Sequence, residues 1–302
     1  MISIPTVLVL GAGSSVEYGF PLGSTLVAQI TTGVANQELT RHLTLANHVP
    51  EAIEEFARKL TESESPSIDA FIEGNTPQLV EIGRAAIAIS ILRAEKKCLD
   101  ERRLTSKPPQ DHWYRYIWER LREGTSAATF GDNKLSIITY NYDRSLEEYL
   151  VARLPPTFNL ERSQAQDLLA RALPIVHVHG VLDGPPFGGY PAHADGAFTR
   201  SLASRVRVVH DKFAERDEQY VRAHHLLAGA RTVAFLGFGF HQANVDRLAL
   251  AKHVSEAQAY VCAYGMGLAE VDVAESRLGV AVKRSSHVYK CWEFLRNVVP
   301  LK

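Results

Sequence analysis

Five short apolar runs, rich in β-branched residues, constrain the fold of this chain more than any other feature of its sequence. They are TVLVLG from Thr6, LSIITYN from Leu135, IVHVHG from Ile175, TVAFLGFGF from Thr232 and AQAYVCAYG from Ala257. Runs of this length and composition are typical of strands buried on both faces of a parallel sheet. Segments with helical periodicity lie between them, so the pattern predicts the α/β class.

The residues that end these runs are small or polar, and they mark the edge at which a parallel sheet binds its ligand. In an open parallel sheet the ligand lies in the crevice outside the carboxyl ends of the strands. Residues 11–15, 141–143, 179–180 and 237–241 should therefore converge on one crevice. We expect a Rossmann-like parallel sheet flanked by helices, with a binding site at this edge.

The turn after the first run is the best candidate for a phosphate site. Residues 7–23 read VLVLGAGSSVEYGFPLG, a buried strand that breaks into glycine, alanine and serine. Small residues let the backbone approach a ligand closely, and a following helix would point its free N–H groups at an anion. We therefore expect the main-chain N–H groups of residues 11–15 to hold a diphosphate. The third glycine of the dinucleotide fingerprint would fall on Val16, so a purely structural strand-to-helix turn is the alternative.

More than a hundred residues separate the first two runs, which is too many for one crossover. Their periodicity predicts helices at EAIEEFARKL from Glu51, LVEIGRAAIAISILRAEKK from Leu79 and HWYRYIWERLREG from His112. We interpret residues 36–129 as a helical subdomain inserted into a single domain of residues 1–302. The Rossmann-like core would then cover about 1–35 and 130–302. The stretch 183–196, rich in glycine and proline, is expected as a loop near the crevice.

Composition argues against several classes of function. The 302 residues include 33 basic and 34 acidic side chains, for a formal net charge of -1. This balance is typical of a cytoplasmic globular protein without general attraction to nucleic acid or anionic lipid. No run approaches the roughly 20 apolar residues that span a bilayer. Cys98, Cys262 and Cys291 are far apart in the sequence, which fits a reducing compartment and argues against a thiolate zinc site. We expect no metal, no membrane and no direct nucleic-acid contact.

Three polar residues at the predicted strand ends are candidates for chemistry. Asn141 offers an amide donor and a carbonyl acceptor, Asp143 a carboxylate, and His179 a ring that titrates near neutral pH. Each of the first two has a structural alternative, because Asn141 can form a turn and Asp143 can cap the helix DRSLEEYL. His177 and His179 are expected on the same strand face, and we assign His177 a structural role. The His-x-His spacing could also suit a metal, but the sequence fixes no third ligand.

The sheet portion of the chain resembles the SIR2 superfamily of NAD-consuming enzymes, especially the bacterial SIR2-like domains that hydrolyse NAD in anti-phage defence. The family's Gly-Ala-Gly-x-Ser turn is similar to residues 11–15, and its Gly-Ile-Pro to residues 19–21. Its Thr-Gln-Asn-x-Asp segment is similar to residues 139–143, its His-Gly to residues 179–180, and its Gly-x-Ser loop to residues 237–239. The motifs occur in the family's order, and the helical insertion lies outside the resemblance.

This resemblance implies an NAD+ glycohydrolase that converts NAD to nicotinamide and ADP-ribose, with NAD as a substrate. It implies catalytic roles for Asn141, which would orient the ribose hydroxyls and the attacking water, and for His179, which would accept a proton. The residues implied to contact NAD are Gly11, Ala12, Gly13, Ser14, Ser15, Pro21, Asp143, Gly237, Phe238 and Gly239. Asp143 would hold the nicotinamide carboxamide. Asp69 lies in an Ile-Asp-x-Phe segment similar to those of SIR2-like domains, and its role stays open.

Two departures from the family pattern bear on the activity. Leu22, Gly23 and Ser24 stand where the family has Asp-Phe-Arg, and the four-cysteine zinc ribbon of sirtuin deacylases is missing. Protein deacylation therefore loses support. A zinc-free deacylase or an ADP-ribosyltransferase is an alternative, and so is a non-catalytic sensor of NAD or ADP-ribose. The resemblance also implies a homo-oligomer activated by assembly or by a regulatory partner, such as a defence-system ATPase or a nucleic-acid sensor.

Overall fold

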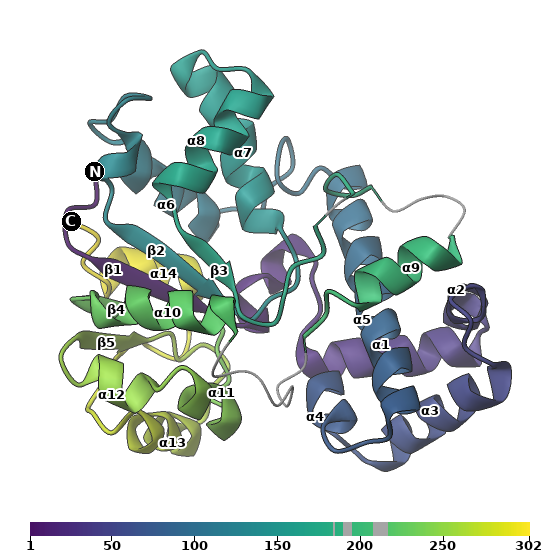
Figure 1. Cartoon of the computed structure of the whole chain (residues 1–302). Helices are drawn as coiled ribbons and strands as arrows, with labels where there is room; N and C mark the ends of the chain where they lie inside the picture. The colour runs from purple at the N-terminus through teal and green to yellow at the C-terminus, as the bar shows by residue number, and fades with distance from the viewer. Residues whose placement is uncertain (184, 190–194, 208–216) are drawn as a thin grey trace.

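The computed structural model describes residues 1–183, 185–189, 195–207 and 217–302, and within them six parallel strands form one sheet. The strand order is β3-β2-β1-β4-β5-β6, the order of a doubly wound dinucleotide-binding sheet. Figure 1 shows the first five of these strands, β3 to β5, side by side. The strands are β1 Thr6–Leu10, β2 Leu135–Thr139, β3 Ile175–His177, β4 Thr232–Leu236, β5 Gln258–Val261 and β6 Lys283–Arg284. The predicted α/β class and Rossmann-like sheet are thus confirmed. Only β6 has no predicted counterpart among the described strands, because both of its residues are charged and exposed.

The register of the central strands brings their carboxyl ends to one level. Leu10, the last residue of β1, lies opposite Thr139 in β2 and Leu236 in β4. The chain order of the strands changes direction on either side of β1, because β2 and β3 lie on one side and β4 to β6 on the other. The crevice at such a switch point is where doubly wound sheets bind ligands.

Helices cover both faces of the sheet (Figure 1), which explains why every residue of β1 is buried. Leu8 and Leu10 join the core on one face, and Val7 and Val9 join the core on the other. The first face carries α6 Trp113–Arg122, α7 Ser145–Phe158, α8 Arg162–Ala172 and α14 Cys291–Asn297. The second face carries α10 Glu218–Ala228, α11 Gln242–Arg247, α12 Leu250–Val254 and α13 Leu268–Leu278. Burial from both sides is the reason the strand runs are apolar throughout.

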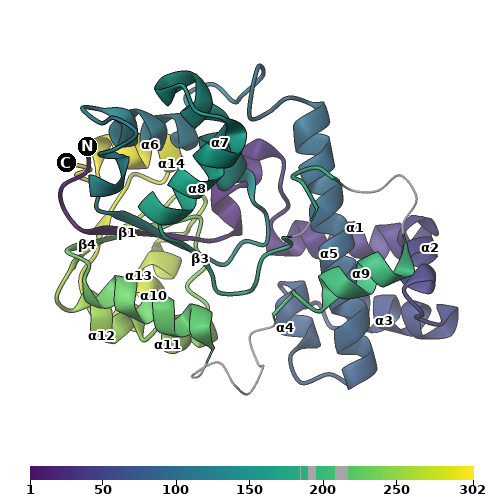
Figure 2. The ribbon, with the colours of Figure 1, turned by 45° about the horizontal axis from the view of Figure 1, so that its top comes forward.

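The remaining α-helices of the described residues form a separate helical lobe beside the sheet (Figure 2). They are α1 Gly23–Ala35, α2 Glu38–Leu45, α3 Pro50–Glu62, α4 Ile68–Ile72, α5 Pro77–Asp100 and α9 Gly196–Ala203. The long helix α5 contributes a row of alanine and isoleucine side chains to the core of the lobe, and α9 packs along it. No helix in the described ranges combines the length and the apolar composition needed to cross a membrane.

The packing divides the chain differently from the boundaries expected from the sequence. Helix α1 lies within residues 1–35, expected in the sheet core, but its Leu26 and Ile30 pack in the helical lobe. Helix α6 lies within residues 36–129, expected in the insertion, but its Trp113 packs in the core that contains β1. Helix α9, from the connection after β3, completes the lobe. Apolar faces, rather than order along the chain, decide which unit each helix joins.

The stretch 183–196, expected as a loop near the crevice, falls partly outside the described residues, at 184 and 190–194. In its described part, Arg144 Nη1 donates to the Pro185 carbonyl over 2.7 Å. The backbone N–H of Gly188 lies 3.5 Å from Glu95 Oε2. These contacts place residues 185–189 beside the start of α7 and the end of α5.

Candidate functional site

A cavity of about 310 Å³ opens at the carboxyl ends of the central strands. Of the residues predicted for the site, those that line it are Gly11, Ala12, Gly13, Ser15, Pro21, Asn141, Asp143, His179, Gly237, Phe238 and Gly239. Ser14 does not line it, and neither do Gly180 and Phe240 from the ranges predicted to converge there. The loops after β1, β2, β3 and β4 therefore meet at one place, as the parallel strands require.

Ser14 supports the site from behind instead of lining it. Its hydroxyl donates to the Gly11 carbonyl over 2.8 Å and accepts from Asn141 Nδ2 over 3.2 Å. Its own carbonyl accepts the indole N–H of Trp113 in α6 over 2.8 Å. Ser14 thus links the first turn by hydrogen bonds to Asn141 and to Trp113 of helix α6.

The N–H groups of the first turn are largely engaged within the protein. Two short 3₁₀ helices, η1 Ala12–Ser14 and η2 Val16–Tyr18, separate β1 from α1. The N–H of Gly13 donates to the Gly237 carbonyl over 3.1 Å, and those of residues 11, 14 and 15 also donate to backbone carbonyls. The anion-binding helix expected directly after the turn begins only at Gly23, which also lines the cavity. Side chains and the start of α1 are therefore the freer donors for an anion.

The glycines of this turn are required by the packing of two loops. A Cβ atom on Gly13 would lie 2.7 Å from the Cα of Gly237, and a Cβ on Gly11 would collide with the Gly237 carbonyl. Gly237 itself has φ +57°, a conformation that favours glycine. Gly239 differs from them, because a Cβ there would meet no atom within 4 Å. The sequence predicted that a ligand approaches the backbone at residues 11 and 13. In the structure, the loop after β4 makes that close approach.

Asn141 is fixed so that one of its atoms stays available. Its Nδ2 donates to the hydroxyls of Ser14 over 3.2 Å and Ser15 over 3.0 Å, and its backbone N–H donates to Thr139 Oγ1 over 3.0 Å. Its Oδ1 is buried and has no hydrogen-bond partner among the residues that the structure describes. Buried polar atoms nearly always have partners, so a ligand group or a water is expected at Oδ1.

His179 presents a second buried atom to the same cavity. Its side chain is only 5% exposed, and its ring packs edge-on against Tyr140 with centroids 4.8 Å apart. Its Nε2 has no partner within the described part of the chain. Burial lowers the pKa of His179, nearby Asp69 opposes that effect, and Arg247 adds to it. The ring is therefore neutral near pH 7, and it can exchange a proton with a ligand.

His177 has a different environment from His179. Its Nδ1 lies 2.8 Å from the Asn141 carbonyl, and its Nε2 lies 2.6 Å from Glu147 Oε1 in α7. Strand β3 ends at His177, and the chain turns at residues 178–180, where Gly180 has φ +85°. His177 faces α7, whereas His179 lines the cavity.

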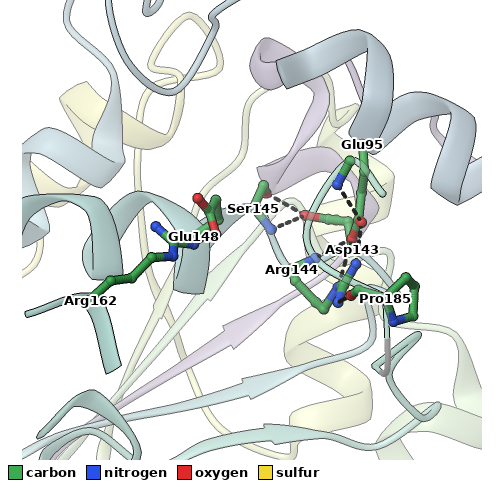
Figure 3. Close-up of polar contacts among 8 residues, drawn as sticks. Glu95, Asp143, Arg144, Ser145, Glu148, Arg162 and Pro185 are labelled. Atoms are coloured by element: carbon green, nitrogen blue, oxygen red, sulfur yellow. Dashed lines mark hydrogen bonds and ion pairs between the residues drawn. The ribbon is translucent and has the colours of Figure 1, made fainter. Parts of the chain in front are cut away.

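Asp143 accepts the first N–H of α7 and also lines the cavity. Its Oδ1 accepts the backbone N–H of Ser145 over 3.1 Å and also the Ser145 hydroxyl (Figure 3). The N-cap residue of α7 is Arg144, so Asp143 satisfies the first N–H of the helix from one position earlier. Burial raises the pKa of Asp143, although its contacts with Ser145 work in the opposite direction. Next to it, Arg144 forms a two-pronged ion pair with Glu95 of α5, whose side chain is fully buried.

The helical lobe supplies a wall of the cavity that the sequence did not predict. Asp69 of α4 lines the cavity, and its Oδ1 accepts the hydroxyl of Tyr142 over 2.8 Å. Tyr142 and His241 also line the cavity, as expected for the ranges 141–143 and 237–241. Lining residues without a prediction are Phe20, Leu22, Gly23, Leu26, Ser67, Ile91, Tyr140 and Asn244. The Oδ1 of Asn244 is a third buried atom without a partner in the described ranges. The sequence SPSIDAF indicates a helix start at Ser67, but no local signal brings that helix to the sheet.

Comparison with known proteins supports one assignment. A family model described as a SIR2-like domain matches residues 135–265. The matched stretch includes β2 to β5 with Asn141, His179 and residues 237–239, and it excludes β1 and most of the helical lobe. No curated protein matches the chain. The match supports a SIR2-like domain in this part of the chain, and SIR2-like domains use NAD.

The donor set of the cavity can be compared with what metals and nucleotides require. In the part of the chain described, no three His, Cys, Asp or Glu side chains are grouped so that they could hold a metal ion. The three cysteines are buried free thiols. By contrast, hydroxyl, amide and imidazole groups surround the cavity, and these bind ribose hydroxyls and carboxamides.

Proposed function

We propose that this protein is an NAD+ glycohydrolase, which converts NAD and water to nicotinamide and ADP-ribose. The observation that carries the proposal is the pair of buried, unpartnered atoms, Asn141 Oδ1 and His179 Nε2, in residues that line one cavity. Each lacks a partner within the described residues, and each is the type of atom that a ribose hydroxyl or an attacking water would satisfy. The SIR2-like match over residues 135–265 supports NAD as the ligand.

The reaction requires that the water and the ribose are correctly oriented, and it depends less on strong acid catalysis. When the bond between the ribose C1′ and the nicotinamide nitrogen breaks, its electron pair neutralises the positive charge of the pyridinium ring. The ribose passes through an oxocarbenium-like state, and a water oxygen bonds to C1′. In our proposal, Asn141 Oδ1 accepts a hydrogen bond from this water or from a ribose hydroxyl, so that the nucleophile is held in line.

His179 serves in the proposal as the acceptor for the proton that the water loses. Its ring is neutral near pH 7 because burial lowers its pKa, and its Nε2 has no competing partner among the described residues. A positioned base of this type contributes on the order of 10²–10⁴-fold to a rate. The proton leaves to solvent after ADP-ribose departs.

The loops around the cavity suggest how NAD lies in it. We place the diphosphate beside residues 11–15 and Pro21, the adenosine toward Gly237, Phe238 and Gly239, and the nicotinamide carboxamide near Asp143. Because four N–H groups of the first turn already have acceptors, the start of α1 would contribute most of the attraction for the diphosphate.

One assay separates this proposal from its competitors. Purified protein is incubated with NAD alone, with NAD and an acylated peptide, and with NAD and an acceptor protein, and the products are resolved by chromatography. We expect nicotinamide and ADP-ribose in equal amounts with NAD alone. Product that appears only with the peptide or the acceptor indicates deacylation or ADP-ribosyl transfer. NAD that is bound but stays intact contradicts hydrolysis and indicates a sensor.

The biological setting is a further part of the proposal and rests on the resemblance alone. We propose a cytoplasmic anti-phage effector that acts as a homo-oligomer and is activated by assembly or by a regulatory partner, such as a defence-system ATPase or a nucleic-acid sensor. Cells that carry the protein should lose NAD after phage infection and before lysis. Unchanged NAD during infection, with the protein present at normal levels, contradicts this role.

A further inference from the structure

Asn141 is held at three points, and the third comes from a residue that the proposed chemistry does not use. Its side-chain amide is held by Ser14 and Ser15, and its backbone N–H by Thr139. Its carbonyl oxygen lies 2.8 Å from Nδ1 of His177. His177 therefore contacts the backbone carbonyl of Asn141, which the hydrogen bonds to Thr139, Ser14 and Ser15 leave unfixed.

The two contacts of His177 determine its protonation. The Asn141 carbonyl can only accept a hydrogen bond, and an ionised Glu147 carboxylate can only accept as well. A neutral imidazole carries one N–H, so it can donate to one of these groups but not to both. The separation of 2.6 Å between His177 Nε2 and Glu147 Oε1 is that of a charge-assisted bond. The geometry thus corresponds to an imidazolium that donates to both neighbours.

The charges around His177 favour this protonated ring. Burial alone lowers the pKa of His177, but Glu147 in α7, the Asn141 carbonyl and Asp143 together raise it above its ordinary value. Glu147 lines a separate hollow of about 720 Å³, whose other charged residues are Arg144, Glu148, Arg162 and Arg222. Arg144 is engaged by Glu95, and the Glu147 side chain is 27% exposed. The carboxylate of Glu147 is therefore the part of this arrangement that meets solvent.

We propose that His177 is a positioning residue, whose doubly protonated ring, clamped between Glu147 and the Asn141 carbonyl, holds Asn141 in its working orientation. The catalytic consequence rests on the proposed NAD hydrolysis, whereas the positioning itself does not. When His177 loses its proton, one of its two hydrogen bonds is lost, and the Asn141 turn loosens. The rate then falls on the alkaline side of neutral pH, separately from any effect of His179 on the acid side.

Nuclear magnetic resonance tests the positioning without turnover. Histidine ring and asparagine side-chain signals are followed against pH in the whole protein, with signals assigned by His177→Gln and Asn141→Ala. We expect the ring of His177 to titrate above about pH 6.5 and the side-chain amide of Asn141 to shift with the same midpoint. A His177 ring that titrates below that pH, or an Asn141 amide that does not respond, overturns the proposal.

Glu147→Gln and Glu148→Gln form a matched pair of variants for the same measurement. Glu148 is the next residue of α7, and it pairs with Arg162 over 2.6 Å on the surface (Figure 3). Glu147→Gln should move the midpoint of His177 down by about one pH unit, which lowers the protonated fraction above the midpoint about tenfold. Glu148→Gln should leave the midpoint in place. Equal shifts in the two variants overturn the assignment to Glu147.

Kinetics then test the catalytic consequence. In Glu147→Gln, kcat for NAD near pH 8 should fall about tenfold while KM stays within about threefold, because orientation is lost and not binding. In His177→Gln the alkaline decline should disappear, because glutamine does not titrate. An unchanged pH profile in both variants overturns the catalytic role. Absence of NAD turnover in the wild type, with the coupled titration present, contradicts the proposed function and leaves the positioning of Asn141 established.

Discussion

Asn141 and His179 each keep one buried polar atom without a partner in the described part of the chain, while their other contacts are fixed. Leaving such an atom unsatisfied costs on the order of 1–3 kcal/mol. A ligand that offers a hydrogen bond to Asn141 Oδ1 or His179 Nε2 removes that cost when it binds. The two residues are therefore better suited to meeting a ligand than to stabilising the fold.

We expect Asn141→Ala and His179→Ala to lose on the order of a hundredfold or more in NAD hydrolysis while they unfold cooperatively. Both residues lie at strand ends, so truncation removes polar contacts more than core volume. The rate is measured by nicotinamide release, and the fold by circular dichroism and a thermal melt. Near-normal turnover in either folded variant would count decisively against the assigned site.

The acid side of the pH profile should report His179. Only the neutral ring accepts a proton, and burial keeps its pKa below the ordinary value of about 6.5. The kcat/KM for NAD should therefore be level near pH 7 and fall only as the pH drops below about 6.5. His179→Gln should retain a low rate without that fall. A fall of kcat/KM on acidification that begins well above this pH in the wild type contradicts the role of His179 as a base.

At the scale of elements, the glycines in the loops after β1 and β4 have two different roles. Some allow the two loops to pack closely, and others line the cavity. Gly13 abuts the backbone of Gly237, whereas Gly239 faces open space within the lining of the cavity. Gly13→Val should therefore lower the melting temperature by several degrees, because a Cβ there collides with backbone. This substitution cannot by itself separate a phosphate cradle from a structural turn.

Gly239→Val provides that separation. Its side chain would extend into the lining of the cavity without meeting neighbouring atoms, so we expect a melting temperature close to that of the wild type. NAD binding, measured by calorimetric titration, should weaken about tenfold or more, because the added methyl groups occupy space that the adenosine end is proposed to use. Wild-type affinity in a folded Gly239→Val protein would remove residues 237–239 from the binding site.

The strands could be predicted from the sequence, and the helical lobe could not be placed. β1, β2 and β4 are apolar on both faces, and a sequence pattern records that burial directly. The helices of the lobe have apolar faces, and the sequence pattern of each helix does not show which other helix that face packs against. For this reason the sequence placed helix α1 in the sheet core, whereas its Leu26 and Ile30 pack in the core of the helical lobe.

At the scale of the whole molecule, one buried ion pair joins the lobe to the sheet. Glu95 of α5 is fully buried, and Arg144 before α7 is 14% exposed. Burial raises the pKa of Glu95, and its contacts with Arg144 oppose that rise. Glu95→Ala leaves a buried guanidinium without its partner, so the free energy of unfolding should drop by about 3–5 kcal/mol.

An exposed pair in the same lobe serves as the control. Arg58 and Glu62 lie 2.6 Å apart with side chains 58% and 59% exposed, and Glu62→Ala should cost less than about 1 kcal/mol. Both variants are compared by urea denaturation. Similar losses in the two variants would contradict a special role for the Glu95–Arg144 pair in joining the lobe to the sheet.

The candidate site was predictable to the extent that it depends on strand ends. Asn141, His179 and residues 237–239 follow strands, so parallel packing brings them together. Asp69 and Tyr142 meet across more than seventy residues of chain, and no spacing rule predicts that contact. The sequence also could not show that N–H groups of the turn 11–15 already donate hydrogen bonds within the protein. Their acceptors include residues of β4 and of the loop after it, which are far away in the sequence.

The helical lobe is made from two separate pieces of chain, and this limits how it can be exchanged between proteins. Residues 23–100 supply α1 to α5, but α9 arrives from the connection after β3 and adds Leu202 to the same core. A graft of residues 23–100 alone would carry an incomplete core into its new host and leave Leu202 uncovered in the old one. Modular redesign of this protein, such as swapping the lobe to change what reaches the cavity, therefore needs both crossovers transplanted together.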